Sequence, residues 1–183
     1  TISNNQFTTS IIQDAVNITD VTGTLSITHN SLVSDSAPYT PIPIDTYSNG
    51  VIVNNANGSA KLFVVGNFFN NHGGYGLGIT LNQEAKADVY ITDNTVLGAV
   101  GFEYPLSIAF PGISPSAIGI VVFSRGNSTC TSSILNNTCQ YQEAGGIMVA
   151  AAESSSCFPL VQNNVVMPGL LVPVSGDIAG FGI

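Results

Sequence analysis

The chain repeats one short motif six times. An apolar residue is followed three positions later by asparagine, and two positions after that by an apolar or thiol residue. The copies are ISNNQF (Ile2 to Phe7), ITHNSL (Ile27 to Leu32), VVGNFF (Val64 to Phe69), ITDNTV (Ile91 to Val96), ILNNTC (Ile134 to Cys139) and VQNNVV (Val161 to Val166). Each copy is too short to bury its own apolar face, so the copies must stack to share a core. The repeat therefore predicts a solenoid.

A second motif, glycine followed by apolar, any and apolar residues, alternates with the first. It begins at Gly50, Gly76, Gly119, Gly146 and Gly180. From each of the first four glycines to the next asparagine motif the chain always takes 14 or 15 residues, whereas the return varies from 9 to 25. Short alternating apolar segments between Asn, Gly and Ser clusters are typical of strands and turns. We therefore expect three short parallel strands per repeat, with length variation confined to one corner.

The motif asparagines are predicted to stack into a ladder at a sharp turn. Asparagine tolerates the left-handed conformation of such turns, and its amide can bond to its copy in the neighbouring repeat. This interpretation makes them scaffold rather than metal or sugar ligands. The ladder would comprise Asn5, Asn30, Asn67, Asn94, Asn137 and Asn164.

Together the two motifs resemble those of the right-handed parallel β-helix superfamily, which includes the pectate lyases, over essentially the whole chain. The resemblance implies an all-β, right-handed parallel β-helix of about six three-strand rungs. The stretch from Ile134 to Val149 (ILNNTCQYQEAGGIMV) is also similar to the repeats of autotransporter passengers and chlamydial polymorphic outer membrane proteins, although those usually carry Phe where this chain has Ile or Val. The first rung fits least well, and its first strand is expected near Ala15 to Ile18.

One domain, residues 1–183, is expected, with long loops at 31–49, 95–118 and 165–179. The chain opens on an asparagine motif and closes on a strand, without a capping helix. Natural solenoids cap such ends, because open strand edges aggregate. We therefore expect either a segment of a longer chain or a subunit that stacks end to end.

The charge balance excludes several partners. Three basic residues face eleven acidic ones, giving a net charge of −8. Nucleic acid and anionic lipid both require Lys and Arg, so neither is an expected partner. No apolar run approaches the ~18 residues of a membrane span, so no membrane insertion is expected.

The solubility of the chain depends on Asn, Ser, Thr and Gly instead of charged residues. This composition is common in exported proteins and favours an extracellular or cell-surface location. Candidate N-glycosylation sites are Asn17, Asn57, Asn127 and Asn136.

The repeat also places the cysteines. Cys130 and Cys157 each lie four residues before an asparagine motif, so they should sit in register on neighbouring strands. A strand spacing of ~4.8 Å falls inside the Cα window of roughly 4.4–6.8 Å for a disulfide, which predicts a Cys130–Cys157 bridge and an oxidising compartment. Cys139 takes an inward position and is expected to be a buried free thiol.

The outward face of the glycine-motif strands is where relatives in the superfamily place their catalytic groups. Here it carries no acid, base or metal ligand: its residues are Ile52, Gly78, Val121, Met148 and Gly182. The three cations lie on different repeats, and Asp88 and Asp93 flank one strand instead of facing each other.

The isolated histidines, His29 and His72, are expected to be solvated turn residues. A solvated rim is expected for Glu84, Arg125 and Glu153. No catalytic residue, cofactor or metal site is predicted.

The long loops are unusually apolar, as in PYTPIPIDTY and GFEYPLSIAFPGI. They either fold back over the apolar strip of Ile52, Val121 and Met148, or form an exposed contact surface anchored by Tyr39, Tyr47, Phe102 and Tyr104. Our leading hypothesis is a non-enzymatic surface β-helix for adhesion or fibre structure. It would contact a protein or glycan, or associate with itself end to end. The alternative is a polysaccharide-binding or polysaccharide-degrading β-helix with catalytic residues in the loops.

Overall fold

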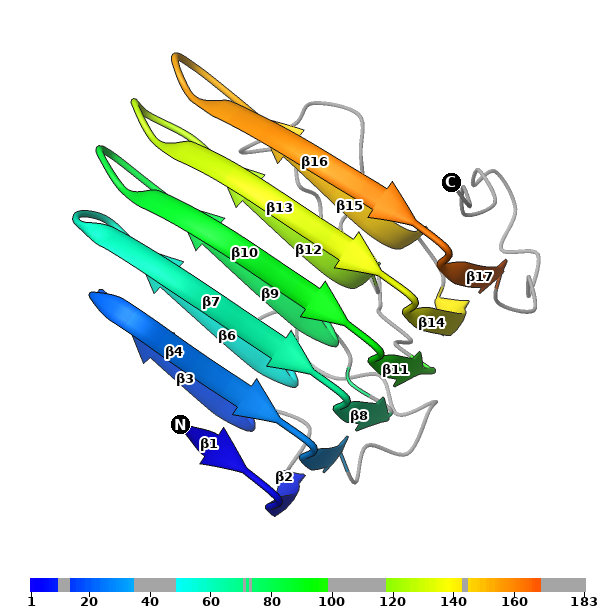
Figure 1. Ribbon diagram of the computed structural model, residues 1–183. Coiled ribbons are helices and arrows are strands. Elements are labelled where there is room, and N and C mark those ends of the chain that lie inside the picture. The colour runs from blue at the N-terminus through cyan, green and yellow to red at the C-terminus, as the bar shows by residue number, and fades with distance from the viewer. Residues whose placement is uncertain are drawn as a thin grey trace, which may run out of the picture.

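The computed structural model describes residues 1–9, 14–34, 49–70, 72, 74–98, 118–142 and 145–168. All regular secondary structure in these ranges is β-strand, arranged as three stacked parallel sheets around one core (Figure 1). The predicted all-β parallel β-helix is confirmed. The long loops, with Tyr39, Tyr47, Phe102 and Tyr104, lie outside the described residues, as do Gly180 and Gly182.

Each sheet collects the strands of one side of the solenoid. Sheet A contains β1 (Ile2–Ser3), β4 (Gly23–Thr28), β7 (Ser59–Val65), β10 (Lys86–Thr92), β13 (Thr129–Leu135) and β16 (Ser156–Gln162). Sheet B contains β2 (Gln6–Thr9), β5 (Ser31–Ser34), β8 (Phe68–Asn70), β11 (Thr95–Leu97), β14 (Thr138–Gln142) and β17 (Val165–Pro168). Sheet C contains β3 (Val16–Thr19), β6 (Val51–Asn55), β9 (Leu77–Leu81), β12 (Ile118–Ser124) and β15 (Gly145–Ala151).

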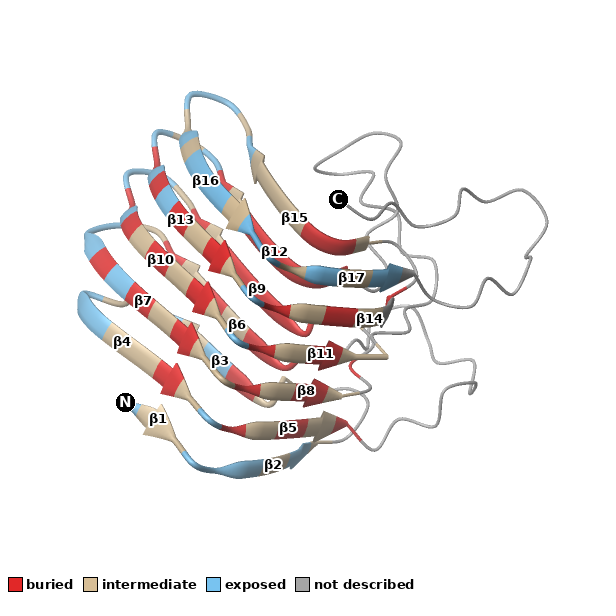
Figure 2. Cartoon of the chain, turned by 45° about the vertical axis from the view of Figure 1, so that its right-hand side comes forward, coloured by how far each residue is buried: buried red, intermediate tan, exposed pale blue. Residues whose placement is uncertain are grey.

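The strand register follows the motif alignment. In sheet A the first residues of the asparagine motifs pair in series: Ile2, Ile27, Val64, Ile91, Ile134 and Val161. In sheet B the last residues of the motifs do the same: Phe7, Leu32, Phe69, Val96, Cys139 and Val166. In the first turn of the chain, Val16 pairs with Val51, which places β3 within one residue of the expected strand. Side chains therefore alternate between the core and the outer face, and burial alternates clearly along β7, β10 and β13 (Figure 2).

The asparagine ladder joins sheet A to sheet B. The Nδ2 of Asn67 donates to Asn94 Oδ1 at 3.0 Å and to the Ile27 carbonyl at 2.9 Å. Its Oδ1 accepts from the backbone N–H of Asn30 at 3.0 Å. The same pattern runs from Asn5 to Asn164, and the ladder asparagines between these two ends are buried. The buried ladder amides thus bond to both neighbouring turns, which ties the solenoid together along its length. The three amides that also bond to their own turn are those of Asn67, Asn94 and Asn137.

The left-handed residue of this corner precedes the ladder asparagine, so the expectation that the ladder asparagine itself is left-handed is wrong. The preceding residues, with φ between 55° and 65°, are Asn4, His29, Gly66, Asp93, Asn136 and Asn163. These are residue types that enter the left-handed region at low cost. The ladder position is instead specified by its amide, whose oxygen and nitrogen are both bonded. The corner therefore needs two adjacent residues with different physical roles.

The glycine motif marks a second corner, where backbone meets backbone. A Cβ added to Gly76 would lie 2.9 Å from the Gly119 carbonyl oxygen and 2.4 Å from Cγ1 of Val96. A Cβ added to Gly50 would also clash with backbone, because it would lie 2.4 Å from the Gly76 carbonyl oxygen. The repeated glycine is thus required by close approach and not by an unusual φ.

Two buried polar side chains brace the short returns from sheet B to sheet C. His72 and Gln142 each lie five residues after a ladder asparagine. The His72 Nε2–H donates to the Leu32 carbonyl at 3.1 Å, and the Gln142 Nε2–H donates to the Val96 carbonyl at 3.0 Å. The expectation that His72 is solvated is wrong, since it is only 1% exposed. Each bond thus supplies a side-chain donor to a carbonyl of a neighbouring strand of sheet B.

Candidate functional site

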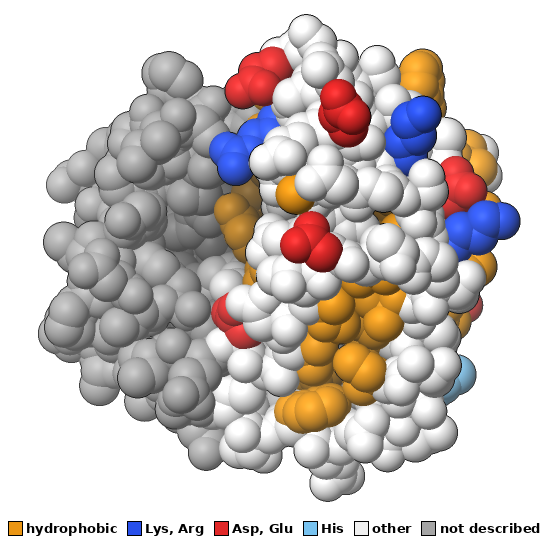
Figure 3. All heavy atoms as spheres, turned by 90° about the vertical axis from the view of Figure 1, so that its left-hand side faces the viewer, with side chains coloured by type: hydrophobic (Ala, Val, Ile, Leu, Met, Phe, Trp, Pro, Cys, Tyr) orange, Lys and Arg blue, Asp and Glu red, His pale blue; other side chains and the backbone are white. Residues whose placement is uncertain are grey.

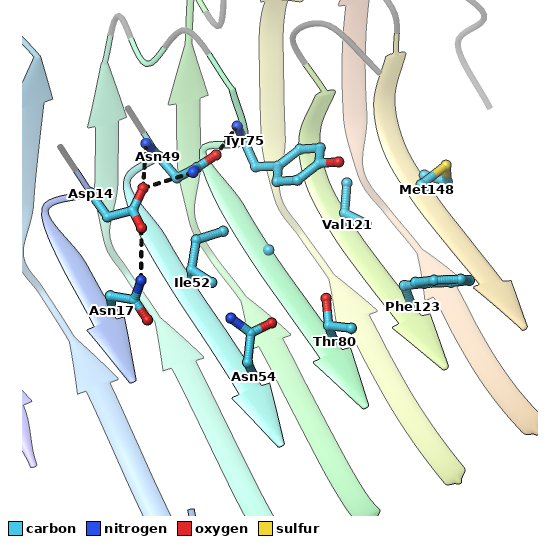
Figure 4. Close-up of a pocket in the computed structure, with 11 residues that line it drawn as sticks. Asp14, Asn17, Asn49, Ile52, Asn54, Tyr75, Thr80, Val121, Phe123 and Met148 are labelled. Carbon is cyan, nitrogen blue, oxygen red and sulfur yellow. Dashed lines mark hydrogen bonds between the residues drawn. The ribbon is translucent and has the colours of Figure 1, made fainter. Parts of the chain in front are cut away.

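A groove of about 350 Å³ crosses the outward face of sheet C (Figure 4). We call it the sheet C groove. Its lining residues are Asp14, Asn17, Asn49, Ile52, Asn54, Tyr75, Gly78, Thr80, Val121, Phe123 and Met148. They come from every strand of sheet C and from the residues just before three of these strands, so the groove runs across the strands along the solenoid.

The floor of the groove is apolar. Ile52, Gly78, Val121 and Met148 occupy equivalent outward positions on neighbouring strands. A Cβ on Gly78 would lie 2.7 Å from Cδ1 of Ile52 and 3.1 Å from Cδ2 of Tyr75, so the missing side chain makes room for both neighbours. The predicted apolar strip of Ile52, Val121 and Met148 is therefore brought together, and it forms a ligand-sized depression.

One end of the groove is built by a hydrogen-bond network around Asp14. Its Oδ1 accepts from the backbone and side-chain nitrogens of Asn49 at 3.1 and 2.7 Å, and its Oδ2 accepts from Nδ2 of Asn17 at 2.9 Å. Oδ1 of Asn49 in turn accepts from the Tyr75 backbone N–H at 2.7 Å. The network holds Tyr75 at the groove. Both oxygens of Asp14, the one carboxylate among the described lining residues, are already bonded.

The remaining wall combines an aromatic ring with short polar side chains. Each of these side chains lies two positions after a floor residue on its strand and points to the same side of the sheet (Figure 4). They are Asn54, Thr80 and Phe123. Burial raises the pKa of the Tyr75 phenol, which keeps it protonated at neutral pH. Among the described residues, no Lys or Arg lines the groove. The lining thus combines aromatic rings, amides and hydroxyls, a combination suited to uncharged polyhydroxylated ligands.

The described groove does not have the geometry of a glycosidase. Such enzymes place two carboxylates about 5–9.5 Å apart across the bond, and Asp14 is the only acid among the described lining residues. In the described part of the chain, no group of three or more His, Cys, Asp and Glu side chains is placed to hold a metal ion. The described lining therefore supplies one carboxylate and not the pair that this chemistry uses.

The sequence patterns did not identify Asp14, Asn49, Tyr75 and Phe123 as groove residues. The first three each lie two residues before the first residue of a strand, at one register position whose residue type changes from turn to turn. Phe123 lies two residues after Val121 on β12. The signal that could have found them is this placement, since all four flank the apolar strip of Ile52, Val121 and Met148.

The predicted Cys130–Cys157 disulfide is wrong, although the predicted register is confirmed. The two residues pair directly between β13 and β16, yet all three cysteines are free thiols. In-register side chains of parallel strands point the same way, which keeps their Cβ atoms near the strand spacing of ~4.8 Å. A disulfide requires a Cβ separation of about 3.5–4.5 Å. The Cα spacing alone was an insufficient test. Cys139 is buried as expected, and burial raises the pKa of its thiol to about 12.

The remaining candidate residues lie on the outer surface. Asn57, Asn127 and Asn136 are exposed at turns, and Asn17 is exposed beside the groove. His29, Glu84, Arg125 and Glu153 are exposed as expected. The Arg125 side chain donates to Asn82, and the Glu153 carboxylate accepts from the Gly126 N–H at 2.8 Å. Figure 3 shows acidic and basic side chains dispersed over one face instead of gathered into a charged patch.

Comparison with protein families, with curated proteins and with solved structures finds no match for this chain. Among the described residues, no helix is long and apolar enough to cross a membrane. The fold and the groove are therefore the observations on which a function can be argued.

Proposed function

We propose that this protein is a non-enzymatic, extracellular or cell-surface β-helix that binds an uncharged glycan in the sheet C groove. The proposal includes kinship with the right-handed, pectate-lyase-like β-helices and their surface-exposed relatives, on the basis of the repeat. The single observation that carries it is the groove, whose apolar floor is flanked by two aromatic rings, amides and a hydroxyl.

The direction and charge of the groove favour an extended, neutral polymer. The floor residues advance by one strand, about 4.8 Å, at each step along the solenoid. A chain lying along this direction would meet the Tyr75 ring and then that of Phe123. An anionic polymer would find no cation in the lining, and the net charge of −8 would repel it. Since both Asp14 oxygens are already bonded, we assign Asp14 to positioning the groove wall.

A glycan array followed by calorimetric titration tests the proposal. We expect binding of a neutral glycan, and Phe123→Ala should weaken it about tenfold, because stacking on an aromatic ring contributes on the order of 1 kcal/mol. Phe63→Ala is the matched control: Phe63 lies on sheet A, where its ring stacks on Tyr90 with the centroids 4.8 Å apart. Absence of glycan binding, or equal effects of the two variants, would contradict the assignment of the groove.

The alternative is a polysaccharide-degrading enzyme with catalytic groups supplied by the long loops. Reducing-sugar and lyase assays on the same glycans distinguish it from the first proposal. Turnover that is lost in Asp14→Asn would replace the non-enzymatic proposal with an enzymatic one. Turnover is not expected from the described lining, which contains one carboxylate.

A fibre role is a second form of the structural proposal, and the last described strands favour it. Among the described strands, β16, β17 and β15 each have a neighbour on one side only. The outer faces of β16 and β17 carry exposed Phe158, Leu160, Val165 and Met167, with 45–63% exposure. Such a surface would suit a second solenoid segment. Electron microscopy should then show filaments, and strictly monomeric particles at high concentration would contradict self-association.

A further inference from the structure

The thiols of Cys130 and Cys157 form an isolated pair at the core side of β13 and β16. Cys130 is fully buried, whereas Cys157 is partly exposed on the last described strand of sheet A. Because the two residues pair in register on parallel strands, their side chains leave the sheet on the same side and the two thiols are neighbours. The pair is therefore preformed, and one member is accessible from solvent.

Two serine hydroxyls complete the surroundings of the pair. Ser124 and Ser132 are buried, and their Oγ atoms have no hydrogen-bond partner. The neighbouring Cys130 thiol lowers the pKa of Cys157, and the hydroxyls of Ser132 and Ser124 act in the same direction. The Cys157 sulfur and burial raise the pKa of Cys130.

We propose that Cys130 and Cys157 form a two-coordinate binding site for a soft, thiol-seeking monovalent cation of the Cu(I) type. Two metal–thiolate bonds of about 2.3 Å in a line separate their sulfurs by about 4.6 Å. In-register side chains on parallel strands are spaced by about 4.8 Å. The spacing that opposes a disulfide thus suits a bridging ion. Soft thiolate ligands select Cu(I) over harder cations.

The number of ligands decides the class of ion. Zinc requires four ligands in structural sites and three protein ligands in catalytic ones, and no such group of His, Cys, Asp and Glu exists in the described ranges. Two thiolates and one monovalent cation carry a net charge of −1, which the hydroxyls of Ser124 and Ser132 can solvate. Binding displaces the thiol protons of the pair, and these protons pass to solvent. No oxidant or reductant is needed.

Native mass spectrometry of the whole chain with Ag(I), a redox-inert stand-in for Cu(I), tests the site. We expect one ion per chain to be retained against excess methionine. Cys157→Ser and Cys130→Ser should each weaken binding by more than about a hundredfold, since losing a direct ligand exceeds the effect of losing an outer-shell partner. Cys139→Ser is the matched control and should bind as the parent chain does. Because Cys157 is partly exposed, Cys157→Ser is the variant expected to fold without a penalty.

Two further readouts separate this site from adventitious binding. Ag(I) should raise the Tm of the parent chain and of Cys139→Ser, but not that of Cys157→Ser. X-ray absorption should find two sulfur neighbours around the ion. The proposal is overturned if no ion is retained, if both pair variants bind as well as the parent chain, or if nitrogen, oxygen or a third sulfur coordinates the metal.

Discussion

The asparagine corner and the glycine corner solve the same packing problem by opposite means. At the first, a buried side chain fills the turn and bonds to the turns on both sides: Asn94 takes part through Nδ2 in bonds to Val64, Thr92 and Asn137. At the second, a side chain is absent, so the Gly119 carbonyl can approach Gly76.

The difference lies in what each corner tolerates. The ladder position requires one particular pattern of donors and acceptors, so even a side chain of the same size fails if it is apolar. The glycine position requires empty space, so the smallest addition is already harmful. A residue can therefore recur in every turn of a solenoid either because its side chain is needed or because the site has no room for one. Substitutions at the two corners should destabilise the fold for these different reasons.

Replacing Asn94 by leucine should give the largest effect. The variant keeps the size of the side chain but removes the acceptor of the Asn67 backbone N–H and the donor to the Val64 carbonyl. It also removes one of the bonds made by Nδ2 of Asn67, by the Thr92 carbonyl and by Oδ1 of Asn137. We expect a loss of about 3–5 kcal/mol in the free energy of unfolding, because each unsatisfied buried group costs about 1–3 kcal/mol and some will find water. Urea denaturation measures the loss.

The end of the ladder provides the control for Asn94→Leu. Asn5 is exposed, and its side chain donates only to Ser3 and Asn30. Asn5→Leu should therefore cost at most about 1 kcal/mol, the typical net value of a hydrogen bond that water can replace. Equal losses for the two variants would mean that the ladder acts through residue size and not through its buried bonds.

Gly76→Ala should have the next largest effect, about 2–3 kcal/mol, because overpacking a rigid site typically costs 1–3 kcal/mol. The added methyl group would meet Val96 at 2.4 Å and a backbone oxygen at 2.9 Å, so neither neighbour can yield freely. Thermal or urea unfolding measures the loss. If Gly76→Ala proved neutral, close approach could not be the reason for the repeated glycine.

A double-mutant cycle separates the two contacts of Gly76. Val96→Ala removes the nearest atoms but leaves the Gly119 carbonyl in place. The double variant should lose less stability than the sum of the single variants, by about 0.5–3 kcal/mol of coupling. Strict additivity would assign the whole penalty to the backbone contact.

The residue before each ladder asparagine should show a smaller, backbone effect. Asp93 is exposed and has φ of 56°, whereas the equivalent residue one turn earlier is Gly66, with φ of 65°. Asp93→Val should lose about 1–2 kcal/mol, the cost of the left-handed region for an ordinary residue, whereas Asp93→Gly should change stability little. Circular dichroism melts of the two variants make the comparison. A harmless valine would show that the corner does not depend on this conformation.

Sequence predicted what repeats and missed what occurs once. The register of Ile91 and Ile134, and the column of asparagines, followed from positions that carry the same chemistry in every copy. The groove residues Asp14, Asn49 and Tyr75 share one register position, but their residue types differ from turn to turn, so no recurring residue marks them. The thiol pair was placed in register, but its bonding depends on the Cβ direction, which spacing along the chain does not encode.

His72 illustrates the same limit and yields the smallest predicted effect. It and Gln142 brace equivalent short returns, yet their different side chains hide the equivalence in the sequence. The His72 hydrogen bond to a carbonyl fixes the Nε2–H tautomer, and Nδ1 is buried without a partner. Burial lowers the pKa of His72 below its ordinary 6.5.

Because the folded chain resists protonation at His72, the unfolded chain binds more protons below pH 6.5. This contribution to stability is thus present above pH 6.5 and is lost as the pH falls toward the lower, folded-state pKa. His72→Gln should keep the bond to the Leu32 carbonyl, as Gln142 does in its own turn, and should flatten the stability profile between about pH 5.5 and 7.5, where carboxylates scarcely titrate. Urea midpoints of parent and variant, measured across that range, test this prediction. Parallel stability profiles would mean that His72 is protonated in the folded chain as readily as in the unfolded chain. The His72 side chain would then not be held as a neutral imidazole.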